Sequence, residues 1–439
     1  MTIKNIRTKV LQIISNEFEI SLSSLSENMG PDNISKWDSM GGLTLMLEIE
    51  KQFNLEFEVD DLLKISNIND IIMLIEKCGL SKNSTKIDEE YEIGICPSNS
   101  INELKSFIHS HWSKENIFLK SNELLDWQHL NKNTNDYNFV IARNNNSNEI
   151  DCILGFIPTK QFDGHLSRLD LWLAIWKVKE NLDLPGLGIK LIRFLETEFR
   201  PNSISSIGIN AEVLPAYKMF KFDEIGILKH YYMINESKNE HNLIKINNEK
   251  ISSSNLKVNN KKSFFLCDKD QLIDLDIKGQ LSFWDSQIPI KSIEYIINRY
   301  CKHPIYKYSV YIISERDKYK GLFISRICQH ENYSALRIVD FIGPSHCLEG
   351  TYHLFQSLIK KCGAEYLDCY NIGIQSNDFF SAGFSLRDKS SDIIIPNYFE
   401  PFERKNVDLT YAYKIYGKSN TEKFRFFKGD CDQDRPNQI

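Results

Sequence analysis

The chain has 439 residues, more than one ordinary hydrophobic core organises, so we expect two or three domains. Hydrophobic residues make up 42% and charged residues 26%, the balance of a globular protein. The first 80 residues carry the whole net charge of −6, because they hold 13 Asp and Glu against 7 Lys and Arg. No basic patch is concentrated enough to predict binding to nucleic acid.

Membrane and secretory classes are not expected either. The sequence contains no apolar run of about 20 residues, which a transmembrane helix needs. The N-terminus lacks the apolar stretch and cleavage site of a secretory signal. The ten cysteines are scattered, without CxxC pairs or zinc-ligand spacing, so we expect reduced thiols in a cytoplasmic protein and no bound metal.

Residues 1–80 are predicted to form an all-α domain of four helices. Apolar residues recur with a period near 3.6 in three segments, and a short fourth element lies near residues 60–63. The three segments are Ile3–Phe18, Ser39–Phe53 and Ile68–Lys77.

Ser39 begins the second long helix, in the run Trp37-Asp38-Ser39-Met40-Gly41-Gly42-Leu43. A serine at this position points its hydroxyl to solvent, and the free N–H groups of a helix start favour an attached phosphodiester. Two interpretations remain open at this point: Ser39 carries such a group, or its hydroxyl caps the helix, as serine commonly does.

The run around Ser39 and the following Leu-Glu-Ile-Glu-Lys-Gln-Phe resemble the acyl carrier proteins, over about residues 1–80. The resemblance implies a covalent 4′-phosphopantetheine arm on Ser39, added by a separate phosphopantetheinyl transferase. It also implies an acyl- or aminoacyl-activating ligase that loads the arm. Coenzyme A is the alternative cofactor.

Residues 81–100 are polar without a sustained period and are predicted to be a linker. From residue 101 to 235 helix and strand signals alternate, which predicts an α/β domain. The expected elements are a helix over 101–112, a hairpin over 139–157, a strand over 169–178, a helix over 189–198, a strand over 206–210 and a last strand over 225–234.

This order resembles the GNAT acyltransferase fold, through a glycine loop at a helix start and the later Asn210 and Tyr217. The resemblance implies a mixed sheet whose splayed pair of strands holds a pantetheine thioester near a strand bulge. Gly186, Leu187 and Gly188 would bind its phosphate through backbone N–H groups, with Asn210 beside the arm. Tyr217 would be the general acid for the leaving thiol. The alternative for Tyr217 is a packing role.

The chain departs from the usual pattern of that family at two positions. Asp183 stands where Arg or Gln is usual before the loop, and Lys221 stands where Gly is usual. Asp183 would repel the phosphates of free coenzyme A, whereas a carrier-bound arm brings a single phosphodiester.

No general base is evident from the sequence. Asp170 and His165 are the leading candidates, followed by His129 and His230, and each has a structural role as its alternative. The aromatic and histidine clusters at 109–112 and 127–129 are expected either to line an acceptor pocket or to pack in the core.

Residues 236–262 are predicted to be a second linker, and residues 263–425 a second GNAT-like domain that is degenerate because no glycine loop is present. This domain would supply acceptor pocket or scaffold. Residues 426–439 form an acidic tail whose alternating Asp430, Asp432 and Asp434 lack the glycine and glutamate of a calcium loop. The tail could instead close on the acceptor site.

Together these resemblances imply an enzyme: an N-acyltransferase that moves an acyl group from its own Ser39-linked thioester to an amine. Fusions of this kind imply an amino sugar, in particular a nucleotide-linked one for surface polysaccharide, as the acceptor. Two alternatives stay open. The chain is a non-catalytic protein that presents its loaded carrier, or a GNAT enzyme that uses free acyl-coenzyme A.

Overall fold

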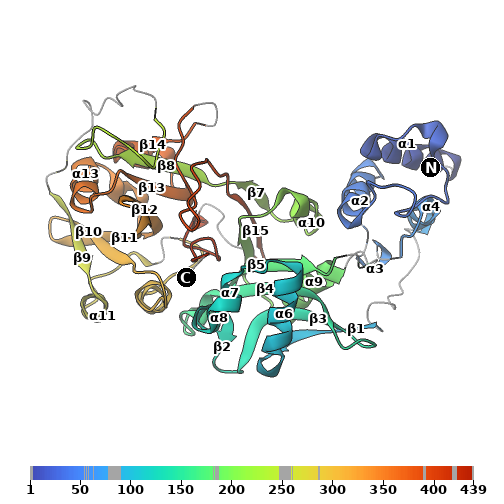
Figure 1. Cartoon of the computed structure of the whole chain (residues 1–439), viewed down its shortest axis with the longest axis horizontal. Coiled ribbons are helices and arrows are strands. Elements are labelled where there is room, and N and C mark those ends of the chain that lie inside the picture. The colour runs from blue at the N-terminus through green and yellow to red at the C-terminus, as the bar shows by residue number, and fades with distance from the viewer. Residues whose placement is uncertain are drawn as a thin grey trace.

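The computed structural model consists of a small helical domain and two mixed β-sheets, each with its own helices, that pack side by side (Figure 1). It describes residues 3–53, 55, 57, 59–62, 64–77, 90–180, 182, 187–246, 259, 261–284, 287–388, 392–417 and 423–437. Within these residues, no helix combines the length and the apolar composition that crossing a bilayer requires.

The N-terminal domain is helical, as the periodicity predicts. Its elements are α1 Ile3–Phe18, η1 Leu22–Ser24, α2 Ser39–Phe53, α3 Val59–Leu62 and α4 Ile68–Lys77. The apolar stripes of the three long helices meet in one core, where Val10, Ile14, Ile49 and Ile71 are fully buried.

Sheet A has the strand order β1-β3-β4-β5-β6-β15-β7, with β2 beside β3. Its strands are β1 Tyr91–Pro97, β2 Leu130–Asn131, β3 Asp136–Asn144, β4 Ile150–Pro158, β5 Asp170–Val178, β6 Ser203–Ile207, β7 Glu224–Ile227 and β15 Thr410–Ile415. The accompanying helices are η2 Ser98–Ser100, α6 Ile101–His111, α7 Ile117–Lys120, α8 Asn122–His129, η3 Thr159–Gln161, α9 Leu187–Phe199, η4 Ala211–Val213 and α10 Leu214–Met219. Only β5 and β6 run parallel, so the sheet is mixed.

Sheet B has the order β14-β8-β13-β12-β11-β10-β9, with β16 beside β13. Its strands are β8 Lys229–Ile234, β9 Lys262–Cys267, β10 Ser309–Glu315, β11 Lys318–His330, β12 Tyr333–Ile342, β13 Tyr366–Ile372, β14 Ser385–Leu386 and β16 Phe426–Phe427. Its helices are α11 Lys269–Ile277, α12 Ile293–Ile296, the π-helical turn η6 Ile297–Cys301, η7 Ser345–Leu348, α13 Tyr352–Lys361 and α14 Ser376–Ser381. The prediction of two mixed α/β sheets is therefore confirmed.

The two sheets exchange strands. β8 follows β7 directly in the chain, yet it lies in sheet B between β13 and β14. β15 comes late in the chain, yet it lies in sheet A between β6 and β7. The single last strand predicted over 225–234 is thus two strands in different sheets, divided at the buried Leu228. The alternation of apolar residues predicts that a strand forms but not which sheet it joins.

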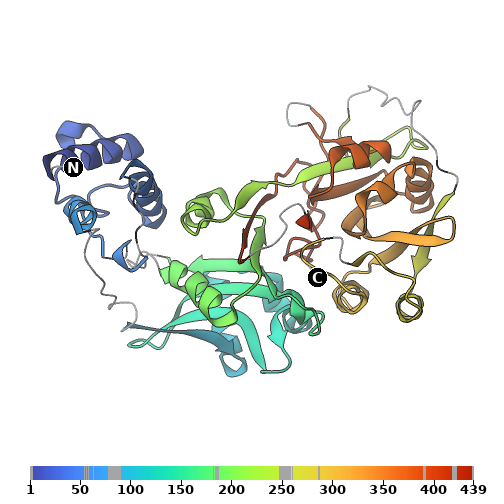
Figure 2. The ribbon, with the colours of Figure 1, turned by 180° about the vertical axis from the view of Figure 1, so that it is seen from behind.

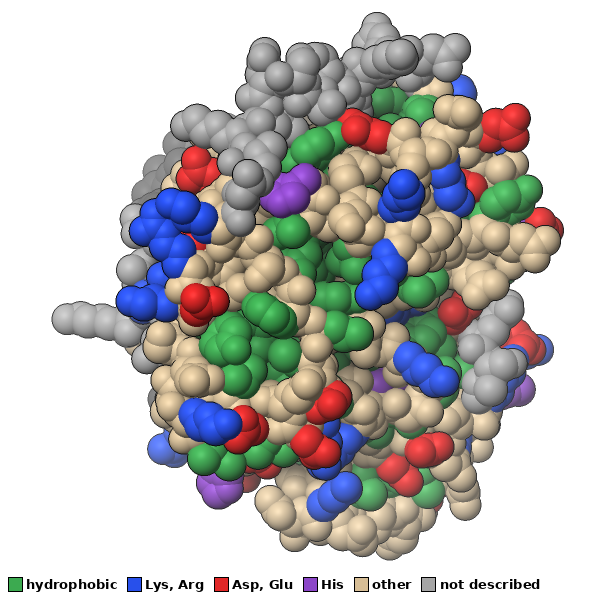
Figure 3. Space-filling model, turned by 90° about the vertical axis from the view of Figure 1, so that its left-hand side faces the viewer, with side chains coloured by type: hydrophobic (Ala, Val, Ile, Leu, Met, Phe, Trp, Pro, Cys, Tyr) green, Lys and Arg blue, Asp and Glu red, His purple; other side chains and the backbone are tan. Residues whose placement is uncertain are grey.

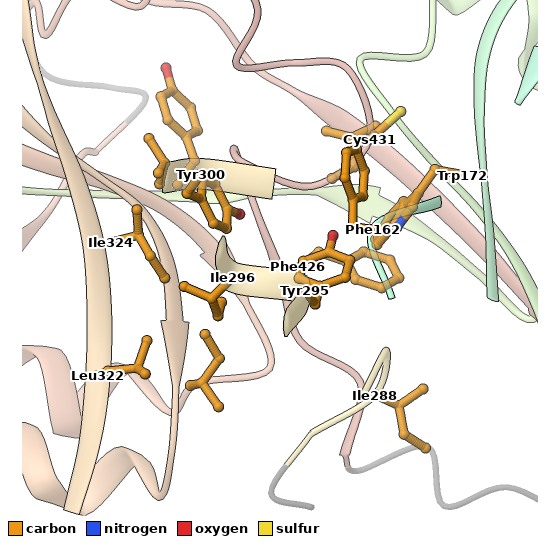
Figure 4. Packing of buried hydrophobic residues seen from close by; sticks show 14 of the residues in the cluster. Phe162, Trp172, Ile288, Tyr295, Ile296, Tyr300, Leu322, Ile324, Phe426 and Cys431 are labelled. Carbon is orange, nitrogen blue, oxygen red and sulfur yellow. The ribbon is translucent and has the colours of Figure 1, made fainter. Parts of the chain in front are cut away.

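One apolar core joins the two sheets (Figure 4). Trp172 of β5 lies edge-on to Phe426 of β16, with the ring centroids 4.9 Å apart. Tyr295, Ile324 and Cys431 belong to the same buried cluster. Because this cluster draws on both sheets, the sheets form one folded body rather than two separate domains on a linker.

Three segments expected to lie outside the folded domains are partly inside them. β1 falls in the predicted linker 81–100, and its Tyr91 is buried. Leu243 and Ile244, in the predicted linker 236–262, are buried against sheet B. The acidic tail runs through the interior, with Asp430 fully buried. Each segment is short and rich in polar residues, so composition alone misplaces it.

The edge strand β9 closes sheet B on the side of the molecule away from the N-terminal domain. On that side, apolar side chains reach the surface between charged ones (Figure 3). Phe265 and Leu266 of β9 are 48% and 56% exposed. Among the described residues β9 pairs with β10 alone, so no described strand covers its other edge.

Candidate functional site

Asp38, rather than Ser39, caps helix α2. The Asp38 carboxylate accepts hydrogen bonds from the backbone N–H groups of Met40, at 3.0 Å, and Gly41, at 2.7 Å. Ser39 is the first residue of the helix. The Asp38 carboxylate therefore fills the role of helix cap, and the role of Ser39 stays a prediction.

The residues around Ser39 form a tight packing unit. Trp37 is buried and stacks on Phe18, with ring centroids 5.8 Å apart. A Cβ atom on Gly42 would lie 3.0 Å from the Trp37 indole nitrogen, and one on Gly41 would lie 2.0 Å from the Lys36 carbonyl oxygen. Both glycines are needed so that the loop before Ser39 can lie against the helix that Ser39 begins.

Helix α2 packs against helix α10 of the body formed by the two sheets (Figures 1 and 2). Leu43, one turn after Ser39, lies against a buried cluster that includes Tyr217 of α10, Phe220 just after it and Leu187 of α9. The start of α2 therefore lies beside the helices that cover sheet A.

Sheet A opens into a notch beside α10, between the ends of β5 and β6. The two strands pair in parallel only from Asp170 to Leu173 on β5 and from Ser203 to Ser206 on β6. Beyond Leu173, β5 pairs with β4 alone, and its register shifts by one residue before Trp176. Such a bulge leaves an extra backbone unit outside the ladder. The splayed strands and the bulge implied by the sequence resemblance therefore occur together.

The C-terminal tail lies in this notch. The Cys431 thiol donates a hydrogen bond of 2.9 Å to the carbonyl oxygen of Leu173, and the backbone of Ile207 hydrogen-bonds to the same sulfur. Burial raises the pKa of the Cys431 thiol well above its ordinary value, so it stays protonated. Gln433 packs on Gly208, whose φ of +80° and close contact both exclude a larger residue.

A matching notch in sheet B is filled by the chain itself. β12 and β13 pair in parallel only through Leu336–Ile338, and β12 then bulges against β11. β16 pairs with β13 just beyond this point, and the Gly429 N–H donates to the Val339 carbonyl at 2.8 Å. Backbone thus occupies the notch of sheet B, whereas the side chains of Cys431 and Gln433 lie in and beside the notch of sheet A.

The predicted phosphate loop is described in part. Leu187 and Gly188 begin α9 and are buried. A Cβ atom on Gly188 would lie 2.9 Å from the indole nitrogen of Trp176, so glycine permits the close approach of α9 to β5. Gly186 and Asp183 lie outside the described residues. Their roles stay predictions.

Tyr217 lies at the notch. It is 3% exposed, and the Ser206 hydroxyl, at the end of the paired part of β6, hydrogen-bonds to its phenol. Burial raises the pKa of the Tyr217 phenol far above its ordinary value of 10. Its ring packs on Trp176 and Phe222, with centroids 5.9 and 4.8 Å away. Tyr217 thus packs and also holds a proton beside the notch, which fits both interpretations of this residue.

The fold does not place the other predicted site residues next to Tyr217. Asp170 accepts a hydrogen bond of 2.7 Å from Ser203 and pairs with Arg168 at 3.2 Å. It lies three residues before Leu173 on β5, which is about 10 Å along a strand that rises about 3.3 Å per residue. His165 is exposed on a separate groove of about 1050 Å³, whose lining includes neither Tyr217 nor Cys431. Asn210 is also exposed, after β6, and makes no capping bond to η4.

The two remaining histidine candidates are structural. His230 is buried in sheet B, where it bonds Asp368 at 3.0 Å and stacks on Tyr370. His129 is fully buried and bonds the Phe156 carbonyl at 3.2 Å. Burial lowers the pKa of each imidazole to about 4, so both are neutral near pH 7.

The buried His129 makes folding sensitive to acid. Because its pKa is about 4 in the folded chain and 6.5 ordinarily, the unfolded state binds the extra proton first as the pH falls. Its contribution to stability is complete above pH 6.5 and is lost by about pH 4. The difference corresponds to about 3 kcal/mol at 1.36 kcal/mol per pH unit.

Denaturant midpoints between pH 7 and pH 4 measure this effect. We expect the midpoint of His129→Phe to fall less steeply with pH than that of the unaltered chain. His165→Gln, which changes an exposed histidine, is expected to keep the original slope. Equal slopes for His129→Phe and the unaltered chain would contradict the prediction.

Three cations pair with the acidic tail, which explains why its carboxylates can lie in the interior. Lys291 pairs with Asp430 at 2.8 Å, Arg326 with Asp434 at 2.9 Å, and Arg435 with Asp432 at 3.3 Å. The sequence does not reveal the first two pairs, because 139 and 108 residues separate their partners along the chain. Among the described residues, no His, Cys, Asp and Glu side chains gather as a metal-binding group.

Comparison with known proteins finds no family model and no curated protein that matches this chain. Several solved structures are similar in outline. A GCN5-related N-acetyltransferase from Anabaena variabilis is 13% identical, covers 74% of this chain and 72% of its own, and has a TM-score of 0.44. Saccharomyces cerevisiae N-myristoyltransferase with bound myristoyl-CoA is 10% identical, with coverages of 78% and 86% and a TM-score of 0.40.

A probable N-acyltransferase from Enterococcus faecalis, a conserved protein of unknown function, is 10% identical to this chain. It covers 74% of this chain and 72% of its own, with a TM-score of 0.44. Likenesses at this level of identity and score do not decide the family of a chain.

Proposed function

We propose that this chain is an N-acyltransferase whose N-terminal domain carries the acyl donor on Ser39. One observation carries the proposal: the helix that Ser39 begins packs against α10, Leu43 lies against the buried cluster that contains Tyr217, and Tyr217 lies at the notch between β5 and β6. A donor site and a reaction site are thus held on adjoining elements of one chain, which raises the effective concentration of the donor.

The residues at the notch suit a covalent pantetheine arm. Asp38 caps α2 through the Met40 and Gly41 N–H groups, so the Ser39 hydroxyl is not needed there. Phosphopantetheine bound at Ser39 would supply the acyl thioester. Leu187 and Gly188 begin a second helix at the notch and would hold part of the arm through backbone N–H groups.

The residues of the chain provide three elements that acyl transfer needs. The bulge in β5 frees a backbone unit that could polarise a carbonyl oxygen. Tyr217 holds a proton on its buried phenol beside Ser206. The apolar cluster around Leu187 and Phe220 excludes water, which strengthens both interactions and protects a thioester from hydrolysis.

The acceptor would approach the notch from the side of the tail opposite to the donor arm. A surface cavity of about 480 Å³ includes Trp112 and shares Arg435 and Asn437 with an inner polar cavity of about 130 Å³. The inner cavity is lined by Gln433, which packs on Gly208 next to the notch. An amine, in particular that of a nucleotide-linked amino sugar, is the acceptor we propose for this path.

Co-expression with a promiscuous phosphopantetheinyl transferase tests the donor half of the proposal. We expect the intact mass to rise by one phosphopantetheine group. Once an activating ligase has acylated the thiol of that arm, the protein is expected to transfer the acyl group to an amine and release the free thiol. Ser39→Ala should lose both the mass gain and the transfer. Ser35→Ala, an exposed serine in the preceding turn, should keep both.

Other outcomes separate the alternatives. A mass gain without transfer to any amine would leave a carrier-presenting protein. Transfer from added acyl-coenzyme A at the same rate in Ser39→Ala would identify an enzyme that uses the free thioester. Absence of the mass gain in the unaltered chain would sink the tethered-donor mechanism.

A further inference from the structure

The inner polar cavity contains more hydrogen-bonding capacity than its own residues use. The cavity measures about 130 Å³ and lies where the tail passes between the two sheets. This exceeds the space of one water molecule, which occupies about 30 Å³ in the liquid. Its lining residues are Tyr306, Arg326, Asn397, Tyr398, Phe399, Glu400, Lys428, Asp432, Gln433, Arg435 and Asn437.

Asn397 supplies an unused donor. It is 2% exposed, its backbone carbonyl accepts from Arg337 at 2.8 Å, and its Oδ1 accepts from the Lys428 ammonium at 2.5 Å. Its Nδ2 is buried and finds no partner among the described residues. A buried amide donor left unpaired is unfavourable, so this group indicates a ligand that accepts hydrogen bonds.

Lys428 supplies an unbalanced charge. It is 2% exposed and lies over the rings of Tyr370 and Tyr398, at 5.8 and 5.6 Å from their centroids. Within the part of the chain that the structure describes, no carboxylate forms an ion pair with it. Burial, followed by the positive charge of Arg337, lowers its pKa to about 7. A bound anion would favour the charged form.

The other charged residues of the cavity have partners of their own. Arg326 pairs with Asp434 at 2.9 Å, and Arg435 pairs with Asp432 at 3.3 Å. Glu400 accepts a hydrogen bond of 2.7 Å from the Tyr306 hydroxyl. Lys428 and the Asn397 amide therefore remain as two neighbouring donors, one of them cationic, without an anionic partner.

We propose that Asn397 and Lys428 form an anion subsite that binds the acidic group of the acceptor. The shared chemistry is a group with negatively charged oxygens, either a carboxylate or a phosphate. Such a group would accept from Asn397 Nδ2 and Lys428 Nζ, which are charge-assisted contacts of the stronger kind. The assignment to the acceptor rests on the proposed function, because this cavity shares Arg435 and Asn437 with the surface cavity and its Gln433 packs on Gly208 next to the notch.

Thermal unfolding of the full chain in sodium phosphate or sodium acetate, at constant ionic strength, tests the subsite. A ligand that binds only the folded state raises the unfolding midpoint in a saturable way. We expect a saturable rise with at least one anion. A rise with phosphate alone indicates a phosphate-bearing acceptor, and a rise with acetate alone indicates a carboxylate-bearing one.

Two variants remove the subsite by different routes. Asn397→Asp keeps the size of the side chain but places a carboxylate against Lys428, so it should supply the missing counter-ion internally. Lys428→Met removes the charge and keeps the length of the chain. Each should weaken anion binding by about 10- to 100-fold, the effect of losing a hydrogen bond to a charged group. Lys302→Met, at an exposed lysine on the separate groove, should bind like the unaltered chain.

The subsite proposal fails if neither anion gives a saturable rise, or if both variants respond like the unaltered chain. Because the measurement needs neither a loaded Ser39 nor any transfer, it is independent of the proposed function. Transfer activity without anion binding would overturn the subsite alone. Anion binding without any loading of Ser39 would leave the subsite standing and overturn the tethered-donor mechanism. In the active protein, Asn397→Asp should raise KM for the acceptor and leave kcat nearly unchanged.

Discussion

Replacing Tyr217 with phenylalanine is expected to lower kcat for acyl transfer by about 10²- to 10⁴-fold, the usual contribution of a general acid. The hydroxyl is the only group removed, and the ring contacts with Trp176 and Phe222 remain. Because burial keeps the phenol protonated, the lost function is proton donation at the notch. Single-turnover transfer from the loaded protein measures the step directly.

A matched control separates catalysis from stability. Tyr91→Phe also removes a buried tyrosine hydroxyl. Tyr91 lies on β1, the edge strand of sheet A, and its hydroxyl donates to Asp151 at 2.9 Å. Both variants should lose about 1 kcal/mol of stability, the net value of an intramolecular hydrogen bond, while only Tyr217→Phe should lose turnover. Equal turnover in the two variants would leave Tyr217 a packing residue, as the alternative interpretation holds.

The largest loss of stability is expected at Lys291, in the core between the sheets. Its ammonium bonds both carboxylate oxygens of Asp340 at 2.7 Å and pairs with Asp430 at 2.8 Å, and all three side chains are fully buried. Lys291→Met would leave two neighbouring carboxylates buried without a cation. Breaking a buried pair in this way costs about 3–5 kcal/mol.

Urea titration monitored by tryptophan fluorescence would measure this loss, since Trp172 lies in the same core. Lys302→Met, at an exposed lysine a few residues beyond α12, should unfold at the same urea concentration as the unaltered chain. Adding Asp430→Asn to Lys291→Met should restore part of the stability, because one buried charge is removed. A midpoint for Lys291→Met equal to that of Lys302→Met would contradict the prediction.

The sequence predicts where helices and strands form better than it predicts which strands pair with one another. The helices over 3–18, 39–53 and 68–77 follow from an apolar period that depends only on neighbours along the chain. Helix α9 begins at Leu187, two residues before its predicted start at 189, because Leu187 and Gly188 of the predicted loop are already helical. By contrast, β6 begins at Ser203, three residues before its predicted start. Its serines are buried but polar, so the apolar pattern that predicts a strand is interrupted there.

The same difference divides the residues of the candidate site: those in local motifs are predicted, and those placed by long-range contacts are not. Ser39 and Tyr217 stand in local motifs, so the sequence points to them directly. Cys431, Lys428 and Asn397 have no motif, and their positions follow from long-range contacts made by the tail. Asp170 and His165 were plausible by residue type alone, yet their surroundings hold them elsewhere.

The exchange of β8 and β15 between the sheets sets the order in which this protein can mature. While the chain is being synthesised, β6 and β7 have no strand between them until residues 410–415 have left the ribosome. A nascent chain that ends near residue 235 would therefore expose two unpaired strand edges, the kind of surface that promotes aggregation. The N-terminal helical domain, whose core is complete within 77 residues, has no such dependence. At about 5–20 residues per second, the stretch between that core and β15 takes about 20–70 s to synthesise, so helix α2 can fold that long before the notch is complete.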